Sequence, residues 1–366
     1  MKKFPLFLSL ILIISLLAGC AGTPVVYYTE CTCPPAAHEV VAEPSPAPVV
    51  PETEAPVAAE GALKTGLAIN ASVGKSASAA ADAAGKADYD VTMVAVLVDD
   101  NGVIQSCIID GIASSVAFDA TGAITSDLTV APQTKNELGE NYNMVAWGGA
   151  IAEWDAQAAA LANFAVGKTV EELKTGAVSE TGYAPEGTDL ATQATIYLGG
   201  YVSTIEAAVA NAKHLGAQAG DVLKMATITG IGDSAAATAE KAGNAQLNAD
   251  VTAITMNGDV ITSCYIDSVQ AKVAFDATGA ITSDVTAPVA TKNQLGENYG
   301  MVAWGGAIAE WDAQAASFAA YVTGKTADEV AGIAITEATK PADADLAATV
   351  TISVIGFMNL ITKAAQ

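Results

Sequence analysis

The chain has 366 residues, with 16 basic and 40 acidic side chains and a formal net charge of −24. All its basic residues are lysines, so it lacks the guanidinium groups that clamp phosphates and carboxylates in a bidentate manner. An acidic chain without a basic cluster is not expected to bind nucleic acid, whose phosphates must be neutralised. The only histidines are His38 and His214. We therefore expect no histidine-based metal site and no Ser-His-Asp triad, and an enzyme is not the favoured interpretation.

Residues 1–19 are predicted to be a signal peptide. A positive start precedes an apolar run over 4–16, which is shorter than the roughly 20 residues of a membrane-spanning helix. The run leads into Leu-Ala-Gly directly before Cys20. This segment resembles a bacterial lipoprotein signal, which implies that Cys20 becomes the acylated first residue of the mature chain. We expect an extracytoplasmic protein held to the cell membrane by N-terminal lipid; the alternative is a plain secretory signal with an incidental cysteine.

Residues 20–60 are predicted to be the lipidated N-terminus followed by a tether. Seven of the 13 prolines lie within 34–56, mixed with Ala, Val and Glu. This composition favours extended polyproline II, in which about 40 residues reach on the order of 120 Å. Cys31 and Cys33 lie in the tether, and a disulfide between them would be strained. They are either a redox or metal pair, or free or partner-linked thiols.

The rest of the chain is an internal duplication. The sequence VAFDATGAITSD at 116–127 and the sequence MVAWGGAIAEWDAQAA at 144–159 both return 157 residues later. We place one copy at 61–213 and the second at 221–366, and each has the length of an ordinary domain.

Both copies begin with a predicted antiparallel meander. The segment 91–98 is apolar and partly alternating, as in a strand, and 99–102 reads Asp-Asp-Asn-Gly, a turn sequence that tolerates positive φ. The chain then returns as a second strand over 103–110. Another hairpin is predicted across the turn 119–122.

A long amphipathic helix is predicted next. Apolar residues spaced by four and three form a stripe: Trp147, Ile151, Trp154, Ala158, Leu161 and Ala165. The spacing of this stripe predicts that Trp147, Trp154 and their repeats Trp304 and Trp311 lie in the core. The alternative is that they form a stacking platform for a flat ligand. Two glycines beside Trp147 are unusual inside a helix. A close approach by a strand or ligand would explain them, and so would a helix that starts only after them.

The end of each copy is predicted to be helical. Thr169 and Glu172 form a capping-box pattern at a helix start. A short strand is predicted over 194–198, or 349–354 in the second copy, before a final helix. The expected fold class is α+β: two tandem copies of an antiparallel sheet packed against helices, after a signal peptide and disordered tether.

Other candidate chemistry is weak. Cys107 and Cys264 occupy matching strand positions, where a buried small apolar role competes with a reactive thiol. The Gly-Lys-Thr around Lys168 lacks the earlier glycine of a phosphate loop. The Asp-rich turns hold too few carboxylates for a calcium loop, so we expect no metal.

One stretch resembles a known family. Residues 189–195 read Asp-Leu-Ala-Thr-Gln-Ala-Thr, which resembles the Asp-x-x-Thr-Gly-Ala-Thr element of extracytoplasmic FMN-binding domains. The order of a hairpin, helices, this motif and a final helix is also similar. The resemblance implies FMN as cofactor, with Asp189, Thr192 and Thr195 as binding residues, and electron transfer outside the cell. Gln193 replaces the glycine of the family motif, and 345–351 in the second copy lacks the acceptor threonine.

Two functions follow as hypotheses. The first is a cell-surface lipoprotein with two FMN-binding-like domains that binds flavin and transfers electrons. The alternative is a cofactor-free structural or interaction lipoprotein of the cell envelope. In both, the membrane is the partner through Cys20, and the sequence identifies no protein partner.

Overall fold

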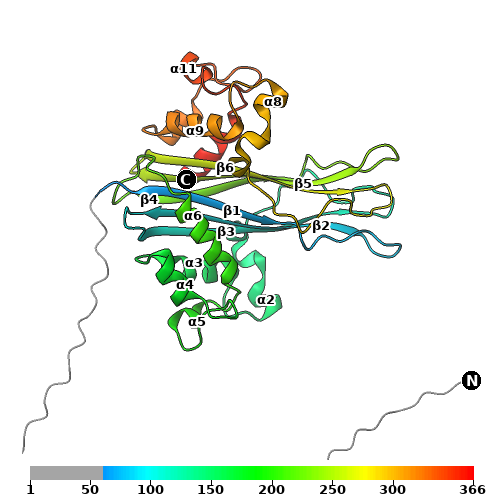
Figure 1. The fold of residues 1–366 in the computed structure, drawn as a ribbon, viewed down its shortest axis with the longest axis horizontal. Helices are drawn as coiled ribbons and strands as arrows, with labels where there is room; N and C mark the ends of the chain where they lie inside the picture. The colour runs from blue at the N-terminus through cyan, green and yellow to red at the C-terminus, as the bar shows by residue number, and fades with distance from the viewer. Residues whose placement is uncertain (1–60) are drawn as a thin grey trace, which may run out of the picture. The chain divides into compact units, whose positions relative to one another are not determined.

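The computed structural model describes residues 61–366, so the predictions for the signal peptide, Cys20 and the tether lie outside the described residues. Each repeat contributes one three-stranded antiparallel sheet (Figure 1). The first has the order β1-β2-β3 and the second the order β4-β5-β6. Their bounds are β1 (Lys64–Ser72), β2 (Gly85–Val98), β3 (Ile104–Phe118), β4 (Val222–Gly230), β5 (Gly243–Asn257) and β6 (Val260–Phe275). The predicted meander is confirmed in both copies.

Helices follow the strands in each repeat. In repeat 1 they are α1 (Lys135–Leu138), the 3-10 helix η1 (Gly139–Tyr142), α2 (Met144–Gly148), α3 (Trp154–Ala165), α4 (Val170–Ala177), α5 (Asp189–Gln193) and α6 (Gly199–Ala210). In repeat 2 they are α7 (Lys292–Leu295), η2 (Gly296–Tyr299), α8 (Met301–Gly305), α9 (Trp311–Val322), α10 (Ala327–Ala331), α11 (Ala344–Ala347) and α12 (Ile355–Ala365). The predicted α+β class is confirmed. So is the capping box of Thr169 and Glu172 at the start of α4.

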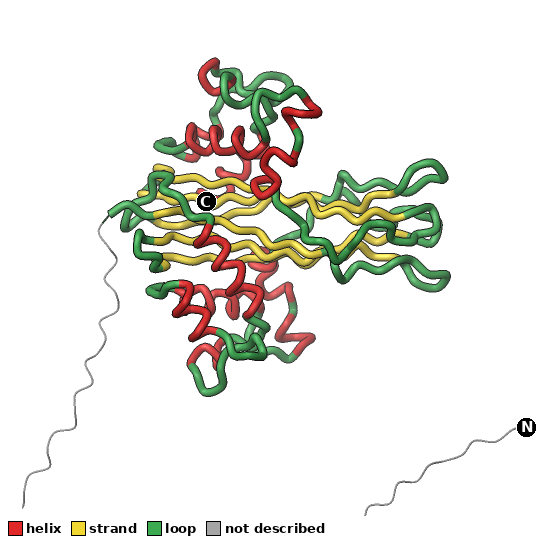
Figure 2. The backbone as a smooth tube through the Cα atoms, viewed as in Figure 1, coloured by secondary structure: helices red, strands yellow, loops and turns green. Residues whose placement is uncertain are grey.

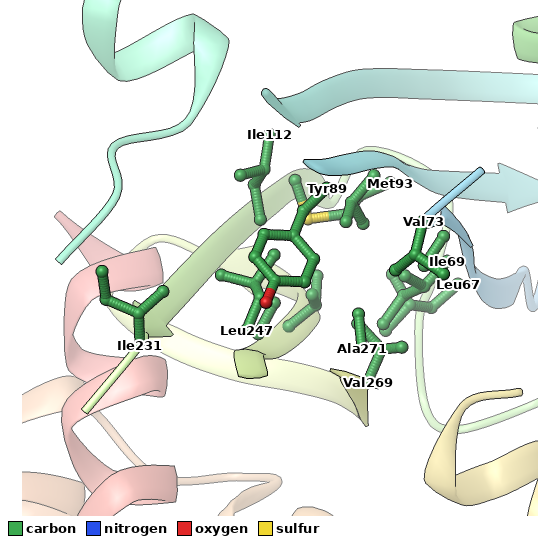
Figure 3. Packing of buried hydrophobic residues seen from close by; sticks show 14 of the residues in the cluster. Leu67, Ile69, Val73, Tyr89, Met93, Ile112, Ile231, Leu247, Val269 and Ala271 are labelled. Atoms are coloured by element: carbon green, nitrogen blue, oxygen red, sulfur yellow. The ribbon is translucent and has the colours of Figure 1, made fainter. Parts of the chain in front are cut away.

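The two sheets pack face to face, and the helices cover their outer faces. One buried cluster joins residues of both sheets, among them Leu67 and Met93 from the first and Leu247 and Val269 from the second (Figure 3). Figures 1 and 2 show the helices of each repeat on the outer side of its own sheet. The described part is therefore a four-layer arrangement, and the repeats share their central core.

The composition of β2 follows from what covers it. Near Val98 both faces are buried: Met93 faces the other sheet, whereas Val94 and Val96 face the helices. Strands buried on both faces read as continuous apolar runs. Toward its start, β2 carries Asp88 and Asp90 between buried residues, so only the inner face is apolar. Figure 2 shows this end of the sheets extending beyond the helices.

The duplicated turn sequence joins the two repeats at this far end. The rings of Phe118 and Phe275 stack with centroids 4.1 Å apart and planes 2° apart. Beside them, the backbone N–H of Ala79 donates to the carbonyl of Gly279, and that of Ala237 to the carbonyl of Gly122, both at 2.8 Å. Both repeats use the same groups, so the contact has an approximate two-fold symmetry.

The predicted helix over 147–165 is wrong, because two helices occupy this stretch. α2 ends at Gly149, which has φ of 63° and accepts the left-handed conformation readily. α3 begins only at Trp154. Of the two explanations offered for the glycines, the helix start after them is confirmed.

The predicted strands over 194–198 and 349–354 are also wrong. The backbone N–H groups of Thr195 and Ile196 donate to the side-chain oxygen of Gln157, at 2.8 and 3.2 Å. Gln314 binds the N–H of Thr351 in the same way. A buried glutamine from α3 or α9 thus satisfies backbone groups that a neighbouring strand would otherwise bind. Within residues 61–366, no helix has the length and apolar character needed to cross a membrane.

Candidate functional site

The four tryptophans divide into two buried and two exposed. Trp154 and Trp311 are 2% and 6% exposed, so their prediction as core residues is confirmed. Trp147 and Trp304 are 88% and 91% exposed, so the same prediction is wrong for them. The break after α2 turns Trp147 away from the stripe that α3 presents to the sheet. The sequence signal for this outcome was the glycine pair beside each ring.

The exposed rings stand on two loops, which we call the tryptophan loops (residues 143–153 and 300–310). Asn143 has φ of 64° and Gly149 has φ of 63°, so a left-handed residue lies on each side of α2. The carboxylate of Glu153 accepts hydrogen bonds from the backbone N–H groups of Met144 at 2.8 Å and Val145 at 3.0 Å. Glu310 does the same in repeat 2, at the same two distances. The starts of α3 and α9 therefore fix the bases of the two loops.

The tips of both loops are apolar. Val145 and Ile151 are exposed beside Trp147, as are Val302 and Ile308 beside Trp304. Between Met144 and Glu153 the sequence carries no charged residue. On a chain of net charge −24, an exposed and uncharged aromatic tip is the kind of feature that marks an interaction site.

A lysine packs against the buried tryptophan of each repeat; Lys135 is buried and Lys292 is half-buried. The ammonium of Lys135 lies 4.8 Å from the ring centroid of Trp154 and 5.5 Å from that of Tyr142. Lys292 lies 4.6 Å from the centroid of Trp311. Burial lowers the pKa of both lysines, while the ring faces favour their charged form. These contacts help to hold the buried tryptophans in place.

A buried aspartate ties each short helix to the sheet. Asp110 accepts from the backbone N–H of Asn136 at 3.1 Å, and Asp267 accepts from that of Asn293 at 3.1 Å. Burial raises the pKa of Asp110, and it raises the pKa of Asp267 to about 6.

The residues of the flavin motif lie together at α5. Asp189 begins the helix, and the Thr192 hydroxyl donates to the Asp189 carbonyl at 2.7 Å. The Thr195 hydroxyl donates to the Gln157 side-chain oxygen at 3.3 Å. All three motif residues are exposed. Tyr197, two residues further on, lines an open cleft of about 580 Å³ at the start of α6.

The two cysteines of the strands are poor nucleophiles. Cys264 is buried and Cys107 is half-buried, and burial raises the pKa of each thiol to about 12. The thiolate, which is the reactive form, is therefore scarce at neutral pH. Among residues 61–366, no group of three His, Cys, Asp or Glu side chains is placed to hold a metal ion.

A second cavity, of about 720 Å³, lies in repeat 2. The connecting segment 210–215 forms one wall, and β6, α7 and α9 form the others. No sequence motif predicts its polar residues to be binding residues. They are far apart in the chain, and no spacing pattern marks them. Comparison of the chain with protein-family models, curated proteins and solved structures finds no match.

Proposed function

We propose that this protein is an interaction lipoprotein of the cell envelope, held to the membrane through lipid on Cys20. In this proposal the two tryptophan loops are its contact sites for an envelope partner. The anchor comes from the sequence of the first 20 residues, and the contact sites from the geometry of the loops. No catalytic step is part of the proposal.

The observation that supports this function is the exposure of Trp147 and Trp304 on fixed loops. Tryptophan is enriched among the few residues that dominate binding energy, where truncation commonly costs about 2 kcal/mol or more. Because Glu153 and Glu310 already hold the loops, binding would order few additional groups.

A comparison between the repeats adds support. The tips read MVAWGGAIA in both copies. In the core behind them, Leu161 of repeat 1 is matched by Phe318, and Tyr201 by Phe357. The exposed tips are therefore identical although some of the core positions behind them differ. An exposed tryptophan contributes little to folding, so this pattern favours a role in binding.

The two loops lie in opposite layers of helices, α2 in one and α8 in the other (Figure 1). One protein is thus expected to hold two partner molecules, or two distant points of one polymer. Two linked contacts bind more tightly than either alone when the geometry lets both engage.

The experiment compares the full chain with Trp147→Ala, Trp304→Ala and the double variant. Each also carries Cys20→Ala, so that no lipid holds it to the membrane. It is incubated with cell envelopes from a strain lacking the protein, and the bound fraction is measured by sedimentation. We expect each single variant to bind at least about tenfold more weakly, a loss of about 1.4 kcal/mol, and the double variant not to bind. Tyr183→Ala, at another exposed aromatic, is the control. Wild-type binding by the double variant would refute the proposal.

We propose flavin binding as the second candidate. Its support is the element order in both repeats: hairpin, helices, the segment at α5 or α11, and a final helix. In this proposal Asp189, Thr192 and Thr195 bind FMN in repeat 1. The full chain is tested for the visible absorption of bound flavin and for a rise in melting temperature with added FMN. Absence of both outcomes contradicts this candidate and leaves the first untouched.

A further inference from the structure

The cavity in repeat 2 follows the length of α9. Asp312 lies at the start of this helix and Thr323 just after its end, about 16 Å apart along the axis, and both line the cavity. Between them, Ala313, Ala316 and Ala320 present only methyl groups. The wall of α9 is therefore smooth and apolar, with a carboxylate at one end.

Polar groups line the other walls. The ammonium of Lys213 lies 5.5 Å from the ring centroid of Tyr265, which projects from β6. Among the described residues, neither Lys213 nor Asp312 forms an ion pair. The side-chain NH2 of Gln294 makes no hydrogen bond within this part of the chain either. His214, by contrast, contacts Asp100 at 3.0 Å.

Repeat 1 differs at the matching place. Glu137, the counterpart of Gln294, pairs there with Lys363 from α12 of the other repeat. Thr195 bonds to Gln157 just as Thr351 bonds to Gln314, so Thr195 and Thr351 are equivalent positions. At the same spacing along the chain, the counterpart of Lys363 is Ala207. Gln294 of repeat 2 thus faces the position of Ala207 of repeat 1, where the corresponding contact is the ion pair of Glu137 with Lys363. Gln294 keeps its side-chain NH2 group for the cavity that it lines.

We propose that this cavity binds a short zwitterionic peptide, with the peptide's ammonium group at Asp312 and its carboxylate at Lys213. An extended residue spans about 3.3–3.6 Å, so the α9 wall limits the peptide to about four residues. The alanine face leaves room for the peptide backbone and small side chains. Gln294 and Tyr265 also line the cavity and bring an amide and a hydroxyl to its walls. Two unpaired charges of opposite sign select a ligand that carries both.

The test uses the full chain and trialanine in isothermal titration calorimetry. N-acetyl-trialanine, which lacks the ammonium, and trialanine amide, which lacks the carboxylate, are the comparison ligands. We expect trialanine to bind and each blocked peptide to bind about two- to fivefold more weakly, because Lys213 is exposed and Asp312 half-buried, and a charge contact in water contributes modestly.

Two variants test which residue binds each end of the peptide. Asp312→Asn is expected to remove the preference for trialanine over its N-acetyl form, and Lys213→Met the preference over its amide. Ala316→Leu fills the cavity and is expected to abolish binding.

Matched variants of repeat 1 keep the test independent of folding defects. Asp155→Asn and Ala159→Leu make the same changes at the positions that correspond to Asp312 and Ala316, and both are expected to leave binding unchanged. No binding of trialanine, equal binding of the blocked peptides, or unchanged binding by Ala316→Leu each overturns the proposal. None of these outcomes bears on the tryptophan loops.

Discussion

The two repeats bury their second tryptophan at the same place but surround it differently. In repeat 1 the indole N–H of Trp154 donates to the hydroxyl of Tyr201 at 2.9 Å. In repeat 2 Phe357 takes that position, with ring centroids 5.6 Å apart, and no hydrogen bond is available to Trp311 from this ring. The helix-sheet core therefore tolerates exchange of a hydrogen bond for an apolar contact as long as an aromatic ring fills the space.

The same comparison distinguishes the contacts that both repeats need for folding from the surface contacts that differ between them. The capping boxes, the glutamine contacts and the glutamate-fixed loops are the same in both repeats, because each satisfies backbone groups that both copies must satisfy. The polar pairs on the outer surface differ, as with Glu137 and Gln294. The predictions below test how far the two repeats behave alike.

The largest effect is expected from Trp154→Ala and Trp311→Ala. Each removes a buried ring and should lower the free energy of unfolding by about 3–5 kcal/mol. Trp154→Ala should cost more, since it also leaves Tyr201 without its donor. We measure urea unfolding of the full chain, with Trp147→Ala as the control, expected to cost less than about 1 kcal/mol. Equal losses at exposed and buried tryptophans would contradict the assignment.

Phe118→Ala and Phe275→Ala test the contact between the repeats. Each is expected to cost about 3 kcal/mol or more, because both rings are fully buried. The double variant should cost less than the sum, by about 0.5–1.5 kcal/mol, since the rings stack on each other. The shared core also predicts one cooperative unfolding transition. Two separate transitions would show that the repeats fold independently.

The pH dependence of stability tests whether the buried carboxyls of Asp110 and Asp267 act alike in the two repeats. A carboxyl whose pKa is raised to about 6 on folding stabilises the native state at low pH, and this contribution is lost as the pH rises through about 6. For Asp267 it is on the order of 2–3 kcal/mol. Asp267→Asn should therefore flatten the decline in stability between pH 4 and pH 8, as measured by urea titrations at several pH values. Asp110→Asn is the matched variant and should act in the same direction.

The smallest expected effect is a gain in stability. Tyr89 is fully buried between the sheets, and its hydroxyl makes no hydrogen bond within the described residues (Figure 3). Its counterpart in repeat 2 is Leu247, which needs no partner. Tyr89→Phe removes an unsatisfied polar group and is expected to raise the free energy of unfolding by about 1 kcal/mol. Tyr201→Phe, which loses a satisfied hydroxyl, should instead destabilise, and urea midpoints distinguish the two.

The sequence alone determined the duplication, the α+β class, the meander, the turns at 99–102 and 119–122, and the capping box. These features depend on local chemistry: a repeated string, a strand pattern, or a side chain within three residues of the backbone group it binds. Trp154 and Trp311 were also placed correctly in the core, because they belong to the stripe of α3 and α9. The flavin residues Asp189, Thr192 and Thr195 stay a prediction, although the chain does bring them together at α5.

Only the tertiary structure decided the rest. The exposure of Trp147 depends on a chain reversal at Gly149 that Glu153 fixes from outside the helix. The absence of a strand over 194–198 depends on Gln157, nearly 40 residues away. The packing of one sheet on the other joins groups as distant as Leu67 and Leu247, which are 180 residues apart. The cavity that Lys213, Tyr265 and Asp312 share joins groups separated by 47 to 99 residues. Periodicity reports which residues share a face of one element, whereas contacts between elements depend on how those faces come together in space.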